Sequence, residues 1–190
     1  MNRNATRQIT VVDIEATCWA NDIDKPAAQV SEIIEIGVCT LDVATLSVQD
    51  KRSVLTFPID SEVSLFCTKL TTLTADKIRA EGVELGAACL YLREFRKSRE
   101  RIWASYGDYD RRMFAENCKR REIPYPFGAR HWNVKSMVAI AFGWPYEVGM
   151  DEALKRMGLE LEGTHHRGVD DAVNIAKILT ELIRNMRGAI

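Results

Sequence analysis

The sequence lacks the features that would place it in several broad classes of protein. Its five cysteines are odd in number and form no C-x-x-C pair, which argues against a disulfide framework or a structural zinc site. No apolar run is long enough to span a bilayer, and the start, MNRNATRQITVV, contains no apolar stretch of signal-peptide length. We therefore expect a cytoplasmic protein with reduced thiols and no membrane contact.

An excess of charge is also missing. Lys and Arg number 26 and Asp and Glu 27, which leaves a net charge of -1. No global attraction to nucleic acid or to a membrane surface follows, so any such binding must use a local patch. With 190 residues, 46% of them apolar, the chain can bury a sizeable core, and we expect a single domain over residues 1–190.

The first third of the chain predicts strands. Residues 8–15, QITVVDIE, are rich in β-branched side chains and are typical of a strand. Two more strands are expected, one at 32–41 and one within 46–57. Their short connections indicate an antiparallel meander.

Helical periodicity dominates the rest. An apolar stripe from Leu85 to Phe95 predicts one helix, residues 109–121 predict a second, and a longer stripe from Val169 to Met186 predicts the last. Shorter elements complete the pattern: a strand at 101–106, a strand turning into a helix over 132–142, and a helix at 151–157. Strands followed by mixed strands and helices favour a mixed sheet covered by helices.

Pairs of acidic residues recur at the ends of these elements. Asp13 and Glu15 are two apart on a strand, so their side chains share one face. Either both reach water at a strand end, or they bind one divalent cation that cancels their repulsion. Further pairs, 108/110 and 170/171, stand at helix starts, where acids also serve as caps. If all three pairs meet in one cleft, an oxygen-only ligand set favours Mg²⁺ or Mn²⁺.

One histidine is spaced to join these acids. His166 precedes Asp171 by five residues, which on a regular helix would set the two about 140° apart. We therefore expect His166 to lie on the loop before the last helix. The neighbouring His165 is expected to face solvent or the substrate.

Three stretches, VVDIEATC, SYGDYDRRMF and HHRGVDDAVNIAKIL, resemble in order the three motifs of the DEDDh 3′→5′ exonuclease superfamily. The resemblance runs from about residue 8 to residue 184 and is nearest to the branch of KapD-type regulators and of exoribonucleases that trim histone messenger and ribosomal RNA. It implies a ribonuclease H-like fold, a mixed five-stranded sheet flanked by helices.

The resemblance also implies roles for single residues. Two Mg²⁺ or Mn²⁺ ions would be held by Asp13, Glu15, Asp110 and Asp171. His166 would be the general base, with Glu15 also in the catalytic set. Asp108 and Asp170 would then only support the starts of their helices.

The stretch FCTKLTTLT, residues 66–74, resembles the wall against which the terminal nucleotide stacks. The implied substrate contacts are Ala16, Thr17, Phe66, Leu70 and Thr71. Phe66 could equally be a core residue. The family often has Leu-Thr-Gly-Ile where this chain has Leu-Thr-Thr-Leu, so the wall lacks a glycine.

Basic side chains near the second motif have two interpretations. They are Arg111, Arg112, Lys119, Arg120 and Arg121, with Arg167 beside the third motif. They could contact phosphates or form an ordinary solvated face.

The activity that the resemblance implies is hydrolysis of single-stranded nucleic acid, RNA rather than DNA, from its 3′ end to nucleoside 5′-monophosphates. Two alternatives stay open: a DNA exonuclease of the proofreading type, and a non-catalytic nucleic-acid-binding regulatory module.

Overall fold

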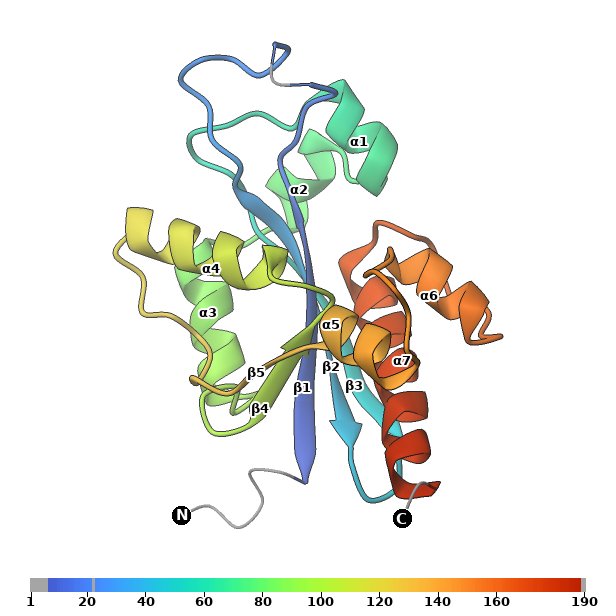
Figure 1. The fold of residues 1–190 in the computed structure, drawn as a ribbon. Helices are drawn as coiled ribbons and strands as arrows, with labels where there is room; N and C mark the ends of the chain where they lie inside the picture. The colour runs from blue at the N-terminus through green and yellow to red at the C-terminus, as the bar shows by residue number, and fades with distance from the viewer. Residues whose placement is uncertain (1–6, 22, 189–190) are drawn as a thin grey trace.

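A five-stranded sheet forms the centre of the molecule in this computed structural model, which describes residues 7–21 and 23–188 (Figure 1). The strands are β1 (Gln8–Ala16), β2 (Ile33–Asp42), β3 (Val48–Leu55), β4 (Ile102–Ser105) and β5 (His131–Asn133). Their spatial order is β3-β2-β1-β4-β5. The expectation that the start of the chain contains no signal peptide falls partly on residues 1–6, MNRNAT, which lie outside the described residues.

The pairing of the strands confirms the predicted mixed sheet. β1, β2 and β3 form the antiparallel meander, whereas β4 runs parallel to β1 and β5 parallel to β4. Because β1 and β4 are parallel neighbours, their carboxyl ends lie at the same edge of the sheet. The first and second sequence motifs are thereby brought together.

Helices cover both faces of the sheet. They are α1 (Leu65–Thr71), α2 (Ala75–Glu81), α3 (Leu85–Glu94), α4 (Tyr109–Arg120), α5 (Val134–Ala141), α6 (Met150–Arg156) and α7 (Gly168–Gly188). One core cluster joins α5, α6 and α7 to residues such as Val11, and the other joins α3 and α4 to residues such as Trp103. Figure 1 shows these two groups on opposite sides of the strands, with α1 and α2 beyond one end of the sheet.

The two apolar stripes bury most of their members but not the last ones. Phe95 is 76% exposed and Met186 is 58% exposed, so the buried part of each stripe ends before these residues. Phe95 follows the last residue of α3, and Met186 lies in the last turn of α7. The spacing of apolar residues cannot show where a helix passes beyond the sheet that it covers.

Helices α1 and α2 were not predicted. Each has only seven residues, and residues 68–74, which span the end of α1 and the link to α2, contain four threonines, a residue type with a low helix propensity. The available signal was the caps: Ser64 accepts a hydrogen bond from the Cys67 N–H, and Thr74 accepts one from the Lys77 N–H. Tertiary packing of Cys67 and Ile78 stabilises both helices.

All five cysteines have free thiols in the structure. Across residues 7–21 and 23–188, none of the helices combines the length and the apolarity that crossing a membrane requires.

Candidate active site

The end of β1 presents two carboxylates on one face of the sheet. Asp13 and Glu15 alternate with Ile14, which packs in the opposite core cluster. Across the antiparallel pair, Asp13 lies opposite Gly37 and Glu15 lies opposite Glu35. The strand therefore positions the first two acids without any help from a loop.

The second motif reaches the same place through a hydrogen bond. The Ile14 N–H donates to Oδ1 of Asp110 over 3.0 Å, although the two residues are 96 positions apart. Asp110 lies in the first turn of α4, and Gly107, with φ of 105°, makes the turn between β4 and that helix. Asp108 is exposed and pairs with Arg111 at 3.0 Å, in agreement with a supporting role.

The third motif closes the cluster. Asp171 lies buried in the first turn of α7, and carboxylate oxygens of Asp13, Glu15 and Asp171 lie within 4.8 Å of one another. Asp170 instead accepts the Thr164 N–H at 2.8 Å and only shapes the loop. A cleft of about 290 Å³ contains the cluster and is lined by Asp13, Ile14, Glu15, Ala16, Cys18, Leu70, Tyr106, Tyr109, Asp110, Met150, His165, His166 and Asp171.

Burial and mutual repulsion make these acids hard to ionise. The pKa of Asp13 is raised well above its ordinary value by burial, by Asp110 and by Asp171. Burial, with Asp171 and Glu35, raises the pKa of Glu15 to about 8. The pKa of Asp110 is raised by burial to about 7, and that of Asp171 is raised for the same cause. Such a site gains stability from any bound positive charge.

The cluster fits a divalent cation. Among the described residues, no lysine or arginine forms an ion pair with Asp13, Glu15, Asp110 or Asp171. The donors are carboxylate oxygens, and the cleft gives them access to solvent ions. Hard cations that take oxygen ligands match this set, and binding them would release the protons that the raised pKa values retain.

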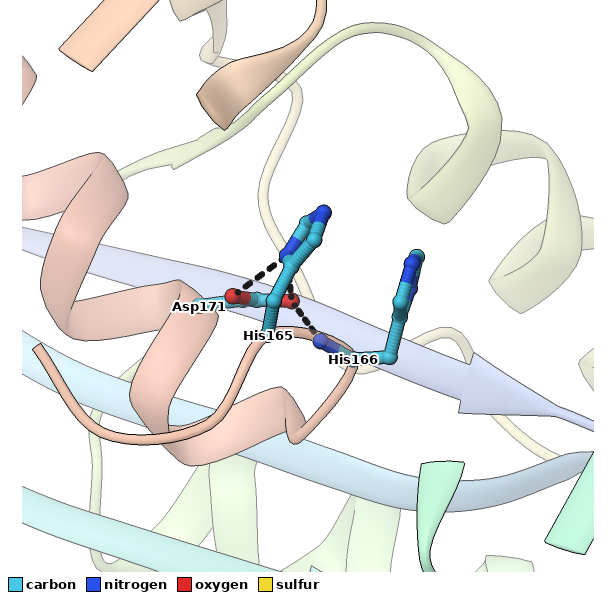
Figure 2. Close-up of side chains that lie close together, drawn as sticks. All are labelled: His165, His166 and Asp171. Carbon is cyan, nitrogen blue, oxygen red and sulfur yellow. Dashed lines mark hydrogen bonds and ion pairs between the residues drawn. The ribbon is translucent and has the colours of Figure 1, made fainter. Parts of the chain in front are cut away.

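The two histidines stand side by side on the loop before α7 (Figure 2). Their rings stack with centroids 4.0 Å apart, and both line the cleft. His166 adopts φ of 64°, and its N–H donates to Oδ2 of Asp171 over 2.9 Å. Burial and the neighbouring His165 lower the pKa of His166, so its imidazole is neutral at pH 7. A neutral imidazole in the cleft can accept a proton.

His165 lines the cleft and also makes a contact that the sequence did not predict. Its Nδ1 lies 3.2 Å from both carboxylate oxygens of Asp171, and its side chain is only partly exposed. It therefore orients Asp171 and does not simply face solvent. Spacing along a loop does not determine where a ring points, because the positive φ of His166 turns the chain between the two residues.

The predicted substrate contacts divide into two groups. Ala16 and Leu70 line the cleft, and Phe66 is 41% exposed, which excludes the core interpretation without placing Phe66 among the lining residues. Thr17 and Thr71 are fully buried. The Thr71 hydroxyl donates to the Cys67 carbonyl. The hydroxyl of Thr71 is therefore engaged inside the protein, and a contact of either threonine with substrate stays a prediction.

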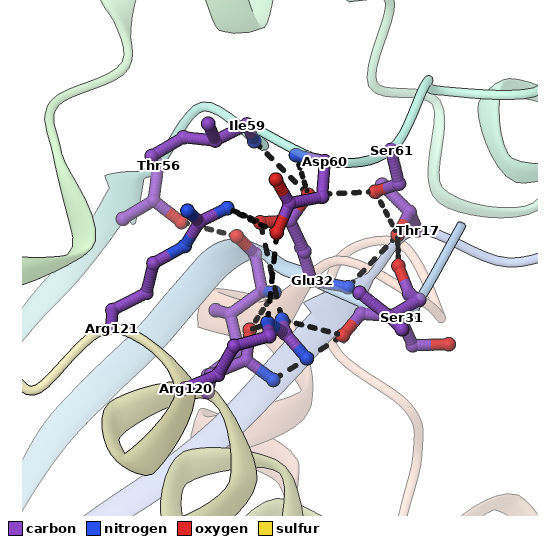
Figure 3. A network of polar contacts seen from close by, with 12 residues as sticks. Thr17, Ser31, Glu32, Thr56, Ile59, Asp60, Ser61, Arg120 and Arg121 are labelled. Atoms are coloured by element: carbon purple, nitrogen blue, oxygen red, sulfur yellow. Dashed lines mark hydrogen bonds and ion pairs between the residues drawn. The ribbon is translucent and has the colours of Figure 1, made fainter. Parts of the chain in front are cut away.

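Thr17 instead belongs to a buried polar network (Figure 3). Its hydroxyl accepts the Glu32 N–H at 2.9 Å and lies 2.9 Å from the Ser61 hydroxyl. The Glu32 carboxylate accepts the N–H groups of Ile59 and Asp60. The network therefore fixes the segment that leads into α1, one wall of the cleft.

The basic face of α4 is largely neutralised. Arg121 pairs with Glu32 at 2.9 Å and with Asp60 at 2.7 Å (Figure 3), and Arg111 pairs with Asp108. Arg167 pairs with the buried Glu35. Arg121 and Arg167 pair with buried carboxylates and so contribute to the packing of the fold, which makes them poor candidates for a phosphate-binding surface; the Arg111 pair is exposed and contributes little to stability.

Sequence reasoning missed several lining residues. Tyr106, Tyr109 and Met150 contribute apolar surface to the cleft. In SYGDYD one tyrosine precedes the two acids and the other lies between them, and this proximity in sequence was the available signal. Met150 comes from α6, whose position beside the cleft only the tertiary structure reveals.

Comparisons with known proteins agree with this geometry. Rat (Rattus norvegicus) 3′-5′ exoribonuclease 1 is 28% identical over 193 residues, which cover 93% of this chain and 53% of the relative. The Drosophila melanogaster 3′-5′ exonuclease Snipper is 25% identical over 200 residues, which cover 93% and 69%. The chain thus spans about half the length of the mammalian exoribonuclease 1 proteins that it matches.

A solved structure is similar over nearly all of both chains. The nuclease domain of 3′hExo, described as a DEDDh family member bound to rAMP, superposes with a TM-score of 0.84 at 25% identity and covers 94% of this chain and 92% of that one. The profile of the exonuclease family RNase_T matches residues 10–179. With the three motifs joined in one cleft and this match over most of its length, the chain belongs to the RNase_T family of exonucleases.

Proposed function

We propose that the protein is a metal-dependent 3′→5′ exonuclease that hydrolyses single-stranded RNA and releases nucleoside 5′-monophosphates. The observation that carries the proposal is the meeting of Asp13, Glu15, Asp110, Asp171 and His166 in one open cleft. The exoribonuclease names of the relatives support RNA as the substrate, and the solved neighbour bound to rAMP supports a site for a nucleotide.

The four acids would hold two Mg²⁺ or Mn²⁺ ions. Such ions, when bound, lower the pKa of an attacking water and stabilise the charge that develops on the departing 3′-oxygen. The water attacks phosphorus, the bond to the 3′-oxygen breaks, and the imidazole of His166 takes the proton of the water. The Nδ1 atom of His165, 3.2 Å from both carboxylate oxygens of Asp171, holds that carboxylate in place.

The apolar lining would bind the terminal nucleoside. Ala16, Leu70 and Tyr109 bring apolar surface next to the acids, which suits the faces of a base and a sugar. Because the cleft is bounded by α1 on one side and by the loop of His166 on the other, it suits a chain end better than a continuous strand.

The first prediction concerns the metal. Excess EDTA should abolish hydrolysis, and Mg²⁺ or Mn²⁺ should restore it, whereas Ca²⁺ should not. Calcium has longer and more variable ligand distances, which would misplace the attacking water. The measurement is the rate of release of mononucleotides from a single-stranded RNA after each addition. Undiminished hydrolysis in EDTA would contradict the assignment of the four acids.

The second prediction concerns polarity and substrate. A 5′-labelled single-stranded RNA should shorten as a ladder from its 3′ end, and a 3′-phosphate on that end should slow the reaction strongly. A DNA of matched sequence, run in parallel, should be degraded more slowly. Internal cuts in a circular strand would point to an endonuclease, and faster digestion of the DNA would favour the alternative substrate.

A further inference from the structure

Glu35 is a fifth acidic residue beside the cluster, and its surroundings differ from those of the other four. It lies on β2 opposite Glu15 and is fully buried. Nε and Nη2 of Arg167 donate to its two oxygens over 3.1 and 3.2 Å. The Gly168 N–H donates to Oε2 over 3.0 Å, and the Ser53 hydroxyl donates to Oε1.

These bonds leave no place for a metal ion on Glu35. An ionised carboxylate offers about four acceptor positions, and two donors occupy each of its oxygens here. Glu15, its partner across the strands, makes no side-chain hydrogen bond among the residues that the structure describes, and its oxygen lies within the acidic cluster. Two neighbouring glutamates thus have different roles, one free to bind a cation and one held by the protein.

The groups that hold Glu35 belong to the loop that carries the third motif. Arg167 and Gly168 directly follow His166, and the Arg167 carbonyl accepts the Asp171 N–H at 2.9 Å. Strand β2 also contacts the start of α7 directly, backbone against backbone. A Cβ added at Gly37 would lie 1.8 Å from the carbonyl carbon of Gly168, so a side chain at position 37 would not fit. The only charged side chain of β2 at this contact is Glu35.

The conformation of His166 needs such an anchor. Its positive φ of 64° is unfavourable for a residue with a side chain and persists only where neighbouring contacts enforce it. The hydrogen bond from the His166 N–H to Asp171 fixes the backbone of His166 itself. The hydrogen bonds from Arg167 and Gly168 to Glu35 fix the two residues that follow it.

We propose that Glu35 is a positioning residue for His166: through Arg167 and the Gly168 N–H it holds the loop in the conformation that directs the imidazole at the attacking water. The inference rests on the proposed function. Glu35 is fully buried and is not among the residues that line the cleft. Its effect on hydrolysis passes through His166, and the two residues should therefore not act independently.

A double-mutant cycle tests this coupling. In Glu35→Gln the neutral amide keeps one oxygen for the Gly168 N–H but turns an NH₂ group toward Arg167, which breaks the paired interaction. With saturating single-stranded RNA and Mg²⁺, kcat should fall about tenfold or more while KM stays within about threefold, because a shift of the order of 1 Å in a catalytic group has this effect. In a His166→Ala background the same change should lower kcat by less than about threefold, since the group that it positions is gone.

Glu32→Gln is the matched control. Glu32 is also buried, immediately precedes the same strand, accepts two backbone N–H groups and pairs with an arginine (Figure 3), but it holds residues 59–61 instead of the His166 loop. Its loss should lower the melting temperature about as much as Glu35→Gln does. At a temperature well below both transitions and at saturating RNA, its kcat should stay within about threefold of the wild-type value. Because Glu32 supports the wall that leads into α1, any effect on RNA binding should appear in KM, the opposite of the pattern expected for Glu35→Gln.

Three outcomes would overturn the inference: a kcat unchanged in Glu35→Gln, an equal loss of kcat with and without His166, or an equal loss of kcat in the Glu32→Gln control. If Glu35→Gln does not fold, Arg167→Met removes the other half of the pair and should give the same cycle. A wild-type protein that does not hydrolyse RNA would instead refute the proposed function itself, so the two failures are distinguishable.

Discussion

Replacing Asp13 with Asn, and separately Asp171 with Asn, is expected to lower the rate of RNA hydrolysis by about a thousandfold or more. Each change removes a charged oxygen ligand from the cluster in which the acids lie within 4.8 Å of one another. Metal-assisted stabilisation of a developing charge contributes several kcal/mol, and each 1.36 kcal/mol corresponds to a factor of ten in rate. Initial rates at saturating Mg²⁺, on protein shown to be folded by circular dichroism, provide the measurement.

Neither change should lower the stability of the folded protein. In EDTA, folding brings the Glu15 carboxyl from an ordinary pKa of 4.5 to about 8, so the folded chain binds more protons than the unfolded chain between these values. The free energy of unfolding must then decrease as pH rises through this range. Burial and the neighbouring Asp110, Asp171 and Glu15 also raise the pKa of Asp13, so its ionised form is unfavourable in the folded protein without metal. Asn at position 13 has no charge to bury, and the melting temperature of Asp13→Asn in EDTA at pH 8 should therefore equal or exceed that of the wild type.

A control comes from the same motif region. Asp108 is exposed and lies two residues before Asp110, outside the cleft lining. Asp108→Asn should leave the rate within about twofold of the wild-type value, as for an ordinary surface substitution. If Asp13→Asn and Asp171→Asn lost activity only in proportion to lost folded protein, these acids would be structural and the metal assignment would be wrong.

His166→Ala should lower kcat by roughly a hundredfold or more at saturating Mg²⁺, in the range for loss of a general base. The wild-type rate should rise with pH and then level off, because the deprotonated imidazole is the active form. Since burial and His165 lower the pKa of His166, the midpoint of this rise should lie below the ordinary value of 6.5. The rise should be absent in the variant. Measuring kcat from pH 5 to 8 with both proteins tests the assignment.

His165→Ala should have a different signature. Its ring contacts both oxygens of Asp171, so its loss should loosen this proposed metal ligand and raise the Mg²⁺ concentration needed for half-maximal rate by about tenfold or more. At saturating Mg²⁺ most of the wild-type kcat should return, and the pH dependence should persist. If His165→Ala were instead the variant that lost the pH dependence, the two histidines would have exchanged roles.

Local patterns in the sequence were sufficient for much of the fold. The β-branched run at residues 8–15 and the strands expected at 32–41 and within 46–57 predicted the meander, and the apolar stripe of α7 identified a helix that covers one face of the sheet. Such patterns repeat with the period of the element itself, so they can be recognised without knowing the partner. Helices α1 and α2 could not be recognised in this way, since seven residues contain too few repeats and the local propensity is against them.

By itself the sequence determined which acids share a face: the period of two in β1 places Asp13 and Glu15 together whatever surrounds them. The order of the three motifs, read through a family resemblance, identified Asp110, Asp171 and His166 as their companions. Only the tertiary structure decided which polar groups remain available for chemistry. The Thr17 and Thr71 hydroxyls are taken by internal hydrogen bonds, His165 turns toward Asp171, and Glu35 is occupied by Arg167, 132 residues away. The physical reason is that a hydrogen bond between distant residues depends on how elements pack against one another, and no pattern within a single element records that packing.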